Sequence, residues 1–268
     1  MNKYKHSNLL IIFLSLVLSS CEKEISINLN KSNPRFVIEG EISNFAGESI
    51  VKITKTLNFD ETIAFPAVSG ALVTISDTLL NKIDTLIESK SGIYNNSDLF
   101  GVVGHTYKLQ VKIGNEIYTS LSTMPSPLVL DSFVQIIPKA NDPKPPAGTP
   151  GADNIQFQAL YKNLPKIDKY IQYVIIRNDT LLNKITVRAN IATTGYFSIP
   201  FSIQARKNDE LKIDIQFIDN TVYDFLNELN GNIGQFSATP SNPTSNISNG
   251  ALGFFKAHTS QKIKLIAK

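Results

Sequence analysis

Short runs in which apolar and polar residues alternate follow one another along most of the chain after residue 34. In residues 106–113 every second side chain is apolar, and Gly114-Asn115 then supplies a two-residue hairpin turn. A period of two is typical of β-strands with one buried face. The pattern predicts strands over residues 35–42, 49–56, 71–75, 82–88, 106–113, 116–123, 130–137, 155–161, 170–177, 185–191, 195–203, 210–219, 252–257 and 262–266.

One segment, near residues 220–230, departs from this period. Its apolar side chains recur every three or four residues, which predicts a helix. Either Asp219 or Asn220 can cap the start of this helix, and Gly231 is expected to end it. The apolar positions are Val222, Phe225, Leu226 and Leu229.

Proline-rich stretches divide the chain. Met-Pro-Ser-Pro at residues 124–127 separates a first block of strands, 35–125, from a second, 128–268. Residues 138–154 contain five prolines and two glycines, which predicts an extended exposed loop within the second block; an interdomain linker is the alternative. Short strands at this spacing predict an all-β fold of two tandem antiparallel β-sandwich domains, transthyretin-like or immunoglobulin-like, with one short helix in the second.

Composition supports a folded chain: 42% of residues are hydrophobic, 18% are charged, and Gly and Pro number only 14 and 13 of 268. The formal net charge of +3 includes Lys3 and Lys5, which lie in a segment expected to be removed. The mature protein is therefore nearly neutral, and no nucleic-acid partner is expected. Cys21 is the only cysteine, so an internal disulfide and a thiolate metal cluster are both excluded.

The N-terminus predicts export. Lys3 and Lys5 precede an apolar run at residues 9–18 that is too short to span a bilayer, so residues 1–20 read as a signal peptide. Leu18-Ser19-Ser20-Cys21 resembles the lipobox of bacterial lipoproteins, in which the cysteine is lipidated and becomes the new N-terminus. Residues 21–34 would then form a lipidated tether. The alternatives are an ordinary secretory signal with an unrelated cysteine, or a short N-terminal membrane anchor.

Acidic residues follow Cys21 directly. Glu22 and Glu24 resemble the surface-export signal of Bacteroidota lipoproteins, although Lys23 interrupts the run. We therefore expect an outer-membrane protein that faces the medium rather than the periplasm. The alternative is a solvated tether without an export role.

No catalytic, metal or cofactor motif occurs in the chain. We expect His105 and His258 to be loop or capping imidazoles, and Glu39 and Glu41 to share a solvent-facing side of a strand. The oxygen-rich residues 95–98 lack the spacing of a calcium loop and are expected to form a polar turn. The sequence thus predicts no catalytic residues, no metal and no cofactor.

Two tyrosines suggest a structural role. Tyr94 and Tyr107 each enter a strand after a glycine turn, which resembles a tyrosine corner, whose hydroxyl bonds back to the backbone. The chain has nine Tyr but no Trp, so a flat aromatic platform for sugar binding would have to use tyrosine.

Three stretches together resemble the Bacteroidota lipoproteins of domain-of-unknown-function family 4249. They are Phe-Val-Ile-Glu-Gly at 36–40; the glycine-punctuated strands over 68–75, 92–94 and 104–109; and Asn-Pro-Thr-Ser-Asn-Ile-Ser-Asn-Gly-Ala-Leu-Gly-Phe-Phe at 242–255, which is the most specific. The resemblance implies an outer-membrane lipoprotein, often encoded beside a TonB-dependent receptor, with no established activity. It carries over no catalytic residues.

The last stretch also has a physical interpretation. Gly250 and Gly253 suit a turn or a close backbone approach, and Phe254 or Phe255 would then fill the core. The stretch would fix the final strand; the alternative is a surface that faces a partner.

Three functions remain open. The first is a non-enzymatic accessory protein that docks on a TonB-dependent receptor. The second is a stand-alone surface module that binds a glycan or peptide, which predicts an exposed groove. The third is a hydrolase, which predicts a pocket holding His105 or His258 beside a carboxylate.

Overall fold

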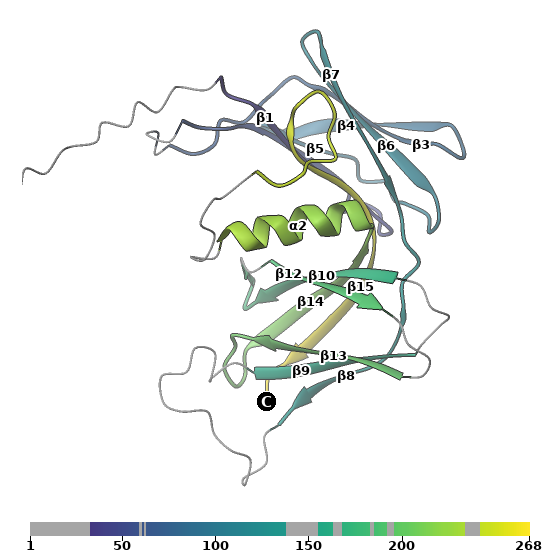
Figure 1. Ribbon diagram of the computed structural model, residues 1–268, viewed down its shortest axis with the longest axis vertical. Coiled ribbons are helices and arrows are strands. Elements are labelled where there is room, and N and C mark those ends of the chain that lie inside the picture. Colours follow the sequence, from purple (N-terminus) through teal and green to yellow (C-terminus); the bar gives the residue numbers. More distant parts are fainter. Residues whose placement is uncertain are drawn as a thin grey trace, which may run out of the picture. The chain divides into compact units, whose positions relative to one another are not determined.

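The computed structural model describes residues 33–58, 61, 63–137, 155–162, 168–182, 185–191, 196–233 and 242–268 (Figure 1). The predicted signal peptide, Cys21, the predicted tether up to residue 32 and the Pro-rich stretch 138–154 lie outside the described residues. Residues Pro34–Leu57 and Thr62–Lys268 form one compact unit that contains every element named below. Within the described part of the chain, no helix combines the length and the apolar character needed to cross a membrane.

The fold is all-β with one described helix, as the alternating pattern predicts. The elements are β1 (Phe36–Ser43), β2 (Ile50–Lys55), β3 (Leu72–Asp77), β4 (Lys82–Lys90), β5 (Ile93–Asn95), β6 (Thr106–Ile113), β7 (Glu116–Thr123), β8 (Val129–Ile136), β9 (Ile155–Lys162), β10 (Asp168–Arg177), β11 (Thr180–Leu181), β12 (Thr186–Ile191), β13 (Tyr196–Ile203), β14 (Glu210–Ile218), α2 (Asn220–Ile233) and β15 (Leu252–Ile266).

The first core lies between β1 and β2 on one side and β3, β6 and β7 on the other. Ile38 and Ile53 face Val73 and Leu109, and all four side chains are fully buried. The prediction that Tyr94 and Tyr107 bond back to the backbone is confirmed, because the buried Tyr107 hydroxyl accepts a hydrogen bond from the Val102 N–H at 2.7 Å. The Tyr94 hydroxyl donates a hydrogen bond to the backbone carbonyl of Val68 at 2.9 Å. These bonds satisfy two polar groups that would otherwise be buried unpaired.

The second core lies between β10, β14 and β15 and the three-stranded sheet β13-β9-β8. Its members alternate along β14, where Leu211, Ile213 and Ile215 are buried on one face. Phe157 of β9 packs into the same core. The opposite face of β14 and β15 is not a simple solvent face, and it holds the polar groups described below.

Strand β15 belongs to both sandwiches (Figure 1). Residues 252–258 pair in parallel with β1, and residues 259–266 pair antiparallel with β14. The sequence predicted two separate strands here, because the alternation disappears between Lys256 and Ser260. It disappears because every side chain from Lys256 to Ser260 is buried, so both faces of the strand are covered. The domain boundary at residues 125–128 stays a prediction.

Helix α2 follows β14 directly. Asp219 caps it: its Oδ1 accepts the backbone N–H of Val222 at 2.9 Å. The buried stripe of Val222, Phe225 and Leu226 forms a third apolar cluster together with Ile218. Gly231 lies inside the helix rather than ending it, because its backbone does not adopt the left-handed conformation of a helix-terminating glycine.

Candidate functional site

A polar network is buried on the face of β15 that also carries α2. Lys256 is 3% exposed, and its Nζ lies 2.9 Å from Glu41 Oε2. The same nitrogen donates hydrogen bonds to Gln216 Oε1 at 2.6 Å and Gln172 Oε1 at 3.1 Å. These acceptors match the three N–H donors of the ammonium group. Because a buried charge is costly unless it is paired, the network stabilises the junction of β1, β10 and β14 with β15.

Glu41 corrects one prediction. Glu39 behaves as expected: its side chain is 44% exposed, and its Oε2 lies 3.3 Å from Lys52 Nζ. The Glu41 side chain is only 31% exposed and pairs with a buried cation instead of facing open solvent. The reason is the parallel pairing of β15 with β1, which places Lys256 directly beside Glu41. Alternation within β1 could not show that a distant strand would cover this face.

His258 lies two residues further along β15, so its expected loop or capping role is wrong. It is 2% exposed. Burial, together with the charges of Lys256 and Lys262, holds the pKa of its imidazole well below the usual range. Its Nδ1 lies 3.2 Å from Ser260 Oγ, and its Nε2 lies 3.8 Å from Glu41 Oε2. The imidazole is therefore neutral at physiological pH and belongs to the core of the junction.

This order of hydroxyl, imidazole and carboxylate resembles a hydrolase triad. The 3.8 Å separation is too long for a hydrogen bond between His258 and Glu41. Ser260 is 6% exposed and already donates to Asp214 Oδ2 at 3.1 Å. A substrate carbonyl cannot reach the serine oxygen in this arrangement, so the cluster supports structure better than acyl transfer.

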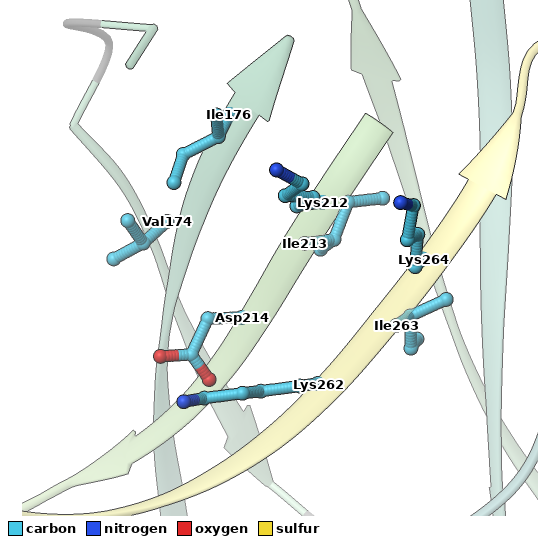
Figure 2. A pocket seen from close by; sticks show the side chains of 8 residues that line it. All are labelled: Val174, Ile176, Lys212, Ile213, Asp214, Lys262, Ile263 and Lys264. Carbon is cyan, nitrogen blue, oxygen red and sulfur yellow. The ribbon is translucent and has the colours of Figure 1, made fainter. Parts of the chain in front are cut away.

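Asp214 connects the network to an open cavity of about 420 Å³ (Figure 2). Its Oδ2 accepts hydrogen bonds from Gln216 Nε2 at 2.8 Å and from Ser260. Its Oδ1 is buried and has no hydrogen-bond partner among the described residues. Burial raises the pKa of Asp214, although those hydrogen bonds and the charges of Lys262 and Lys256 act in the opposite direction. This carboxyl therefore protonates more easily than an exposed aspartate.

The cavity has an apolar wall and a rim of ion pairs. Val174 and Ile176 of β10 form the wall in Figure 2. Each lysine on the rim already has a carboxylate partner: Lys212 pairs with Asp179 and Glu210, Lys264 with Glu210, and Lys262 with Glu48. The positive charge is thus compensated, and the cavity suits an apolar or amphipathic group better than a bare anion.

His105 lies in the turn before β6, so its predicted loop position is confirmed. Its Nδ1 lies 2.6 Å from Asp77 Oδ2. Asp77 Oδ1 also accepts the N–H groups of Leu79 and Leu80 and so caps the turn after β3. Burial would raise the pKa of Asp77, but the hydrogen bonds from His105 and the turn outweigh it and lower the pKa. This pair holds two loops together.

Residues 95–98 form a polar turn closed by a hydrogen bond from the Asp98 N–H to Asn96 Oδ1 at 3.0 Å, as predicted. Among the residues that the structure describes, no group of three or more His, Cys, Asp or Glu side chains could hold a metal ion.

The outward side of β3, β4, β6 and β7, here called the β3 face, is a broad exposed surface. In one row across the sheet, Ser76 pairs with Ile83 and Lys108, and Lys108 pairs with Leu121. Ile83 is 69% exposed and Leu121 59%. The face consists of Leu72, Thr74, Ser76, Ile83, Thr85, Ile87, Lys108, Gln110, Lys112, Ile117, Thr119 and Leu121.

The charged side chains of the β3 face are all positive. Among its twelve positions the ionisable side chains are Lys108 and Lys112, and none is a carboxylate. Its five aliphatic side chains are between 47% and 74% exposed. Exposed apolar groups gathered on one flat face are typical of an interaction surface. The sequence shows the alternation that builds this face. In the structure Ser248 contacts the face at Thr119, where the two side-chain oxygens lie 3.1 Å apart, and the five aliphatic side chains stay exposed.

Comparison with protein families identifies the chain. The family described as "Domain of unknown function (DUF4249)" matches residues 22–264, almost the whole chain. The protein belongs to the DUF4249 family. The predicted resemblance to family 4249 is therefore confirmed. No curated protein sequence matches this DUF4249 chain.

Solved structures are only distantly similar to this DUF4249 protein. A DUF4785 family protein from Legionella pneumophila aligns with 13% identity and a TM-score of 0.27 over 68% of this chain, which spans about half, 52%, of that chain. A two-domain fibronectin type III segment of chicken tenascin aligns with 9% identity and a TM-score of 0.23, over 88% of this chain and 99% of that one. The FN1–FN3 domains of chicken CNTN1 give 9% identity and a TM-score of 0.25, over 88% and 67%.

The stretch most specific to the DUF4249 resemblance fixes the last strand. The side-chain amide of Asn246 makes the two hydrogen bonds that the backbone of a neighbouring strand would make. Its Nδ2 donates to Phe255 O and its Oδ1 accepts the Phe255 N–H, both at 2.8 Å. Gly253 has φ +104°, and a Cβ placed there would lie 2.1 Å from Ile38 O. Phe255 is fully buried in the first core. The structural role expected for these residues is confirmed.

Proposed function

We propose that this protein is an outer-membrane lipoprotein, anchored through lipid on Cys21, that serves as a non-enzymatic accessory or binding partner of a TonB-dependent receptor. The signal peptide and the lipobox-like residues 18–21 support the anchor. Glu22 and Glu24 favour exposure to the medium. The partner is proposed from the family resemblance, and the β3 face is the observation that carries the docking function.

The chemistry of the β3 face favours a protein partner with acidic side chains. Exposed Ile83 and Leu121 supply apolar area, and the hydroxyl and amide groups between them can satisfy polar groups of a partner backbone. Lys108 and Lys112 complement carboxylates. Stacking two copies face to face would instead bring four lysines together without a carboxylate from either face, which disfavours self-association.

The test is purification of the full lipoprotein, with Cys21 intact, from gently solubilised outer membranes. The wild type should retain a TonB-dependent receptor in near-stoichiometric amount. The double variant Ile83→Glu/Leu121→Glu should lose it, because acidic groups on the two outer strands of the face repel an acidic partner. Val129→Glu/Ile136→Glu is the matched control, since these side chains are also exposed, at 52% and 41%, but lie on β8. Recovery of the protein without a receptor, or equal loss in both variants, would contradict the proposal.

A stand-alone binding module is the second candidate, and the cavity beside Asp214 favours it. Its volume of about 420 Å³ and the apolar wall of Val174 and Ile176 fit part of a peptide or an amphipathic glycan. Val174→Arg would fill this cavity while leaving the β3 face intact. If that variant lost ligand binding and still retained the receptor, the cavity and the docking face would be separate sites.

A further inference from the structure

A second exposed apolar surface lies near Arg35, at the N-terminal end of the folded part of the chain, and consists of Ile63 and Phe65. We propose that Ile63 and Phe65 rest in the headgroup region of the membrane that holds the lipid anchor. The inference depends on the proposed lipidation of Cys21 and adds a second, non-covalent membrane contact to it.

Backbone hydrogen bonds place Phe65 beside the start of the folded chain. The Arg35 N–H donates to Thr56 Oγ1 at 2.9 Å, and the Thr56 N–H donates back to Arg35 O at 2.9 Å. The neighbouring Lys55 N–H donates to Pro66 O at 2.9 Å. Since Pro66 follows Phe65 directly, the segment 63–66 lies along the same end of β2 as the residue from which the tether departs.

The side chains at this end suit a lipid surface. Ile63 and Phe65 are each 66% exposed. An aromatic and an aliphatic side chain next to cations are typical of the membrane interface, where the rings enter the headgroup layer and the cations meet lipid phosphates. The cations are Arg35, which is exposed although its guanidinium donates to Gly250 O, and Lys55, whose Nζ lies 5.2 Å from the Phe36 ring.

Tether length makes the bilayer the surface within reach. About 13 residues separate Cys21 from Pro34, and an extended chain spans at most about 3.4 Å per residue, or roughly 45 Å. A lipid on Cys21 therefore holds Pro34 within this distance of the membrane. The far end of β1 is marked by Ser43, whose carbonyl accepts the N–H of Gly101, the residue after the exposed Phe100.

The absence of tryptophan from the chain allows a direct test. The full lipidated protein carrying Phe65→Trp would be placed in phosphatidylcholine–phosphatidylglycerol vesicles with and without brominated acyl chains. Its emission should shift to shorter wavelength and be quenched by the brominated lipid. Phe100→Trp, at a side chain 55% exposed at the opposite end of β1, should show neither effect. A parallel Ile63→Trp variant should behave like Phe65→Trp.

Equal emission of the residue-65 and residue-100 variants, without quenching, would overturn the inference. Failure of the anchor itself would be recognised separately, because an unlipidated protein would lack the added acyl mass on its N-terminal peptide. A protein that carries the lipid and floats with the vesicles but shows no quenching at residues 63 and 65 would leave the anchor intact and refute the second contact.

Discussion

Replacing Gly253 by alanine should disrupt the junction between the two sandwiches. Gly253 lies in β15 opposite Ile38 of β1, in the parallel register that joins the strands. An added Cβ would lie 2.1 Å from Ile38 O and 2.8 Å from Ile38 C, both backbone atoms of a central strand. Rotating a side chain cannot relieve this contact, so β1 and β15 must separate by about 1 Å at this position.

The magnitude follows from two terms. An alanine forced to positive φ costs about 1 kcal/mol relative to glycine. Separating the strands weakens two or three ladder hydrogen bonds, each with a net value of about 1 kcal/mol, and opens the packing around the buried Phe255. We expect Gly253→Ala to lower the free energy of unfolding by about 4 kcal/mol.

Gly250→Ala is the matched control, because Gly250 also has positive φ, +72°, but nothing lies within 4 Å of its added Cβ. It should lose only the conformational term of about 1 kcal/mol. Urea unfolding followed by circular dichroism gives both values, provided that the slopes agree. If Gly253→Ala were within about 0.5 kcal/mol of Gly250→Ala, the close approach of β15 to β1 would be wrong.

Three further predictions concern the buried polar groups. Glu41→Gln should lower the free energy of unfolding by about 2 kcal/mol, because it leaves the Lys256 charge buried without its carboxylate. Lys256→Met should lower it by only about 1 kcal/mol, because Gln216 Oε1 loses its donor but no unpaired cation stays buried; denaturant titration distinguishes the two. Burial raises the pKa of Asp214 in the folded state above its ordinary value of 3.8, so the folded protein binds the carboxyl proton more tightly than the unfolded chain does. The protonated carboxyl therefore stabilises the fold at low pH, and this stability is lost as the pH rises through the raised pKa. The stability of Asp214→Asn relative to wild type should therefore increase from pH 4 to pH 7 in thermal unfolding, and a constant difference would refute this. Asn246→Ala should cost about 2 kcal/mol, because both backbone groups of Phe255 lose their partner; Asn246→Asp, which can accept but not donate, should lose less.

Much of the fold follows from local pattern. Alternation along residues 106–123 predicts β6, β7 and their Gly114-Asn115 turn, and Asp219 was one of two expected caps for α2. These features depend on side chains close in sequence, so the sequence alone determines them. The same holds for Gly253, since a glycine within an apolar strand signals a close backbone approach.

The polar network could not be predicted, because it depends on pairing between distant strands. In the isolated pattern of β14, Asp214 and Gln216 occupy positions that would face solvent. The structure covers them with Lys256 and Ser260, which come from β15 some 40 residues later. One signal was available in residues 256–261, which are polar except for Ala257 and lie between apolar segments. If the strand continues through them, polar groups are buried on both of its faces.

The most direct test of the docking function is site-specific crosslinking in living cells. A photoreactive amino acid at Thr85, on β4 within the β3 face, should form an adduct with an outer-membrane TonB-dependent receptor. The same group at Val134, an exposed position on β8 that is 41% exposed, should form none. Adducts of equal yield from both positions, or no receptor adduct from Thr85 in cells that contain the lipidated protein, would contradict the proposal that this face docks on the receptor.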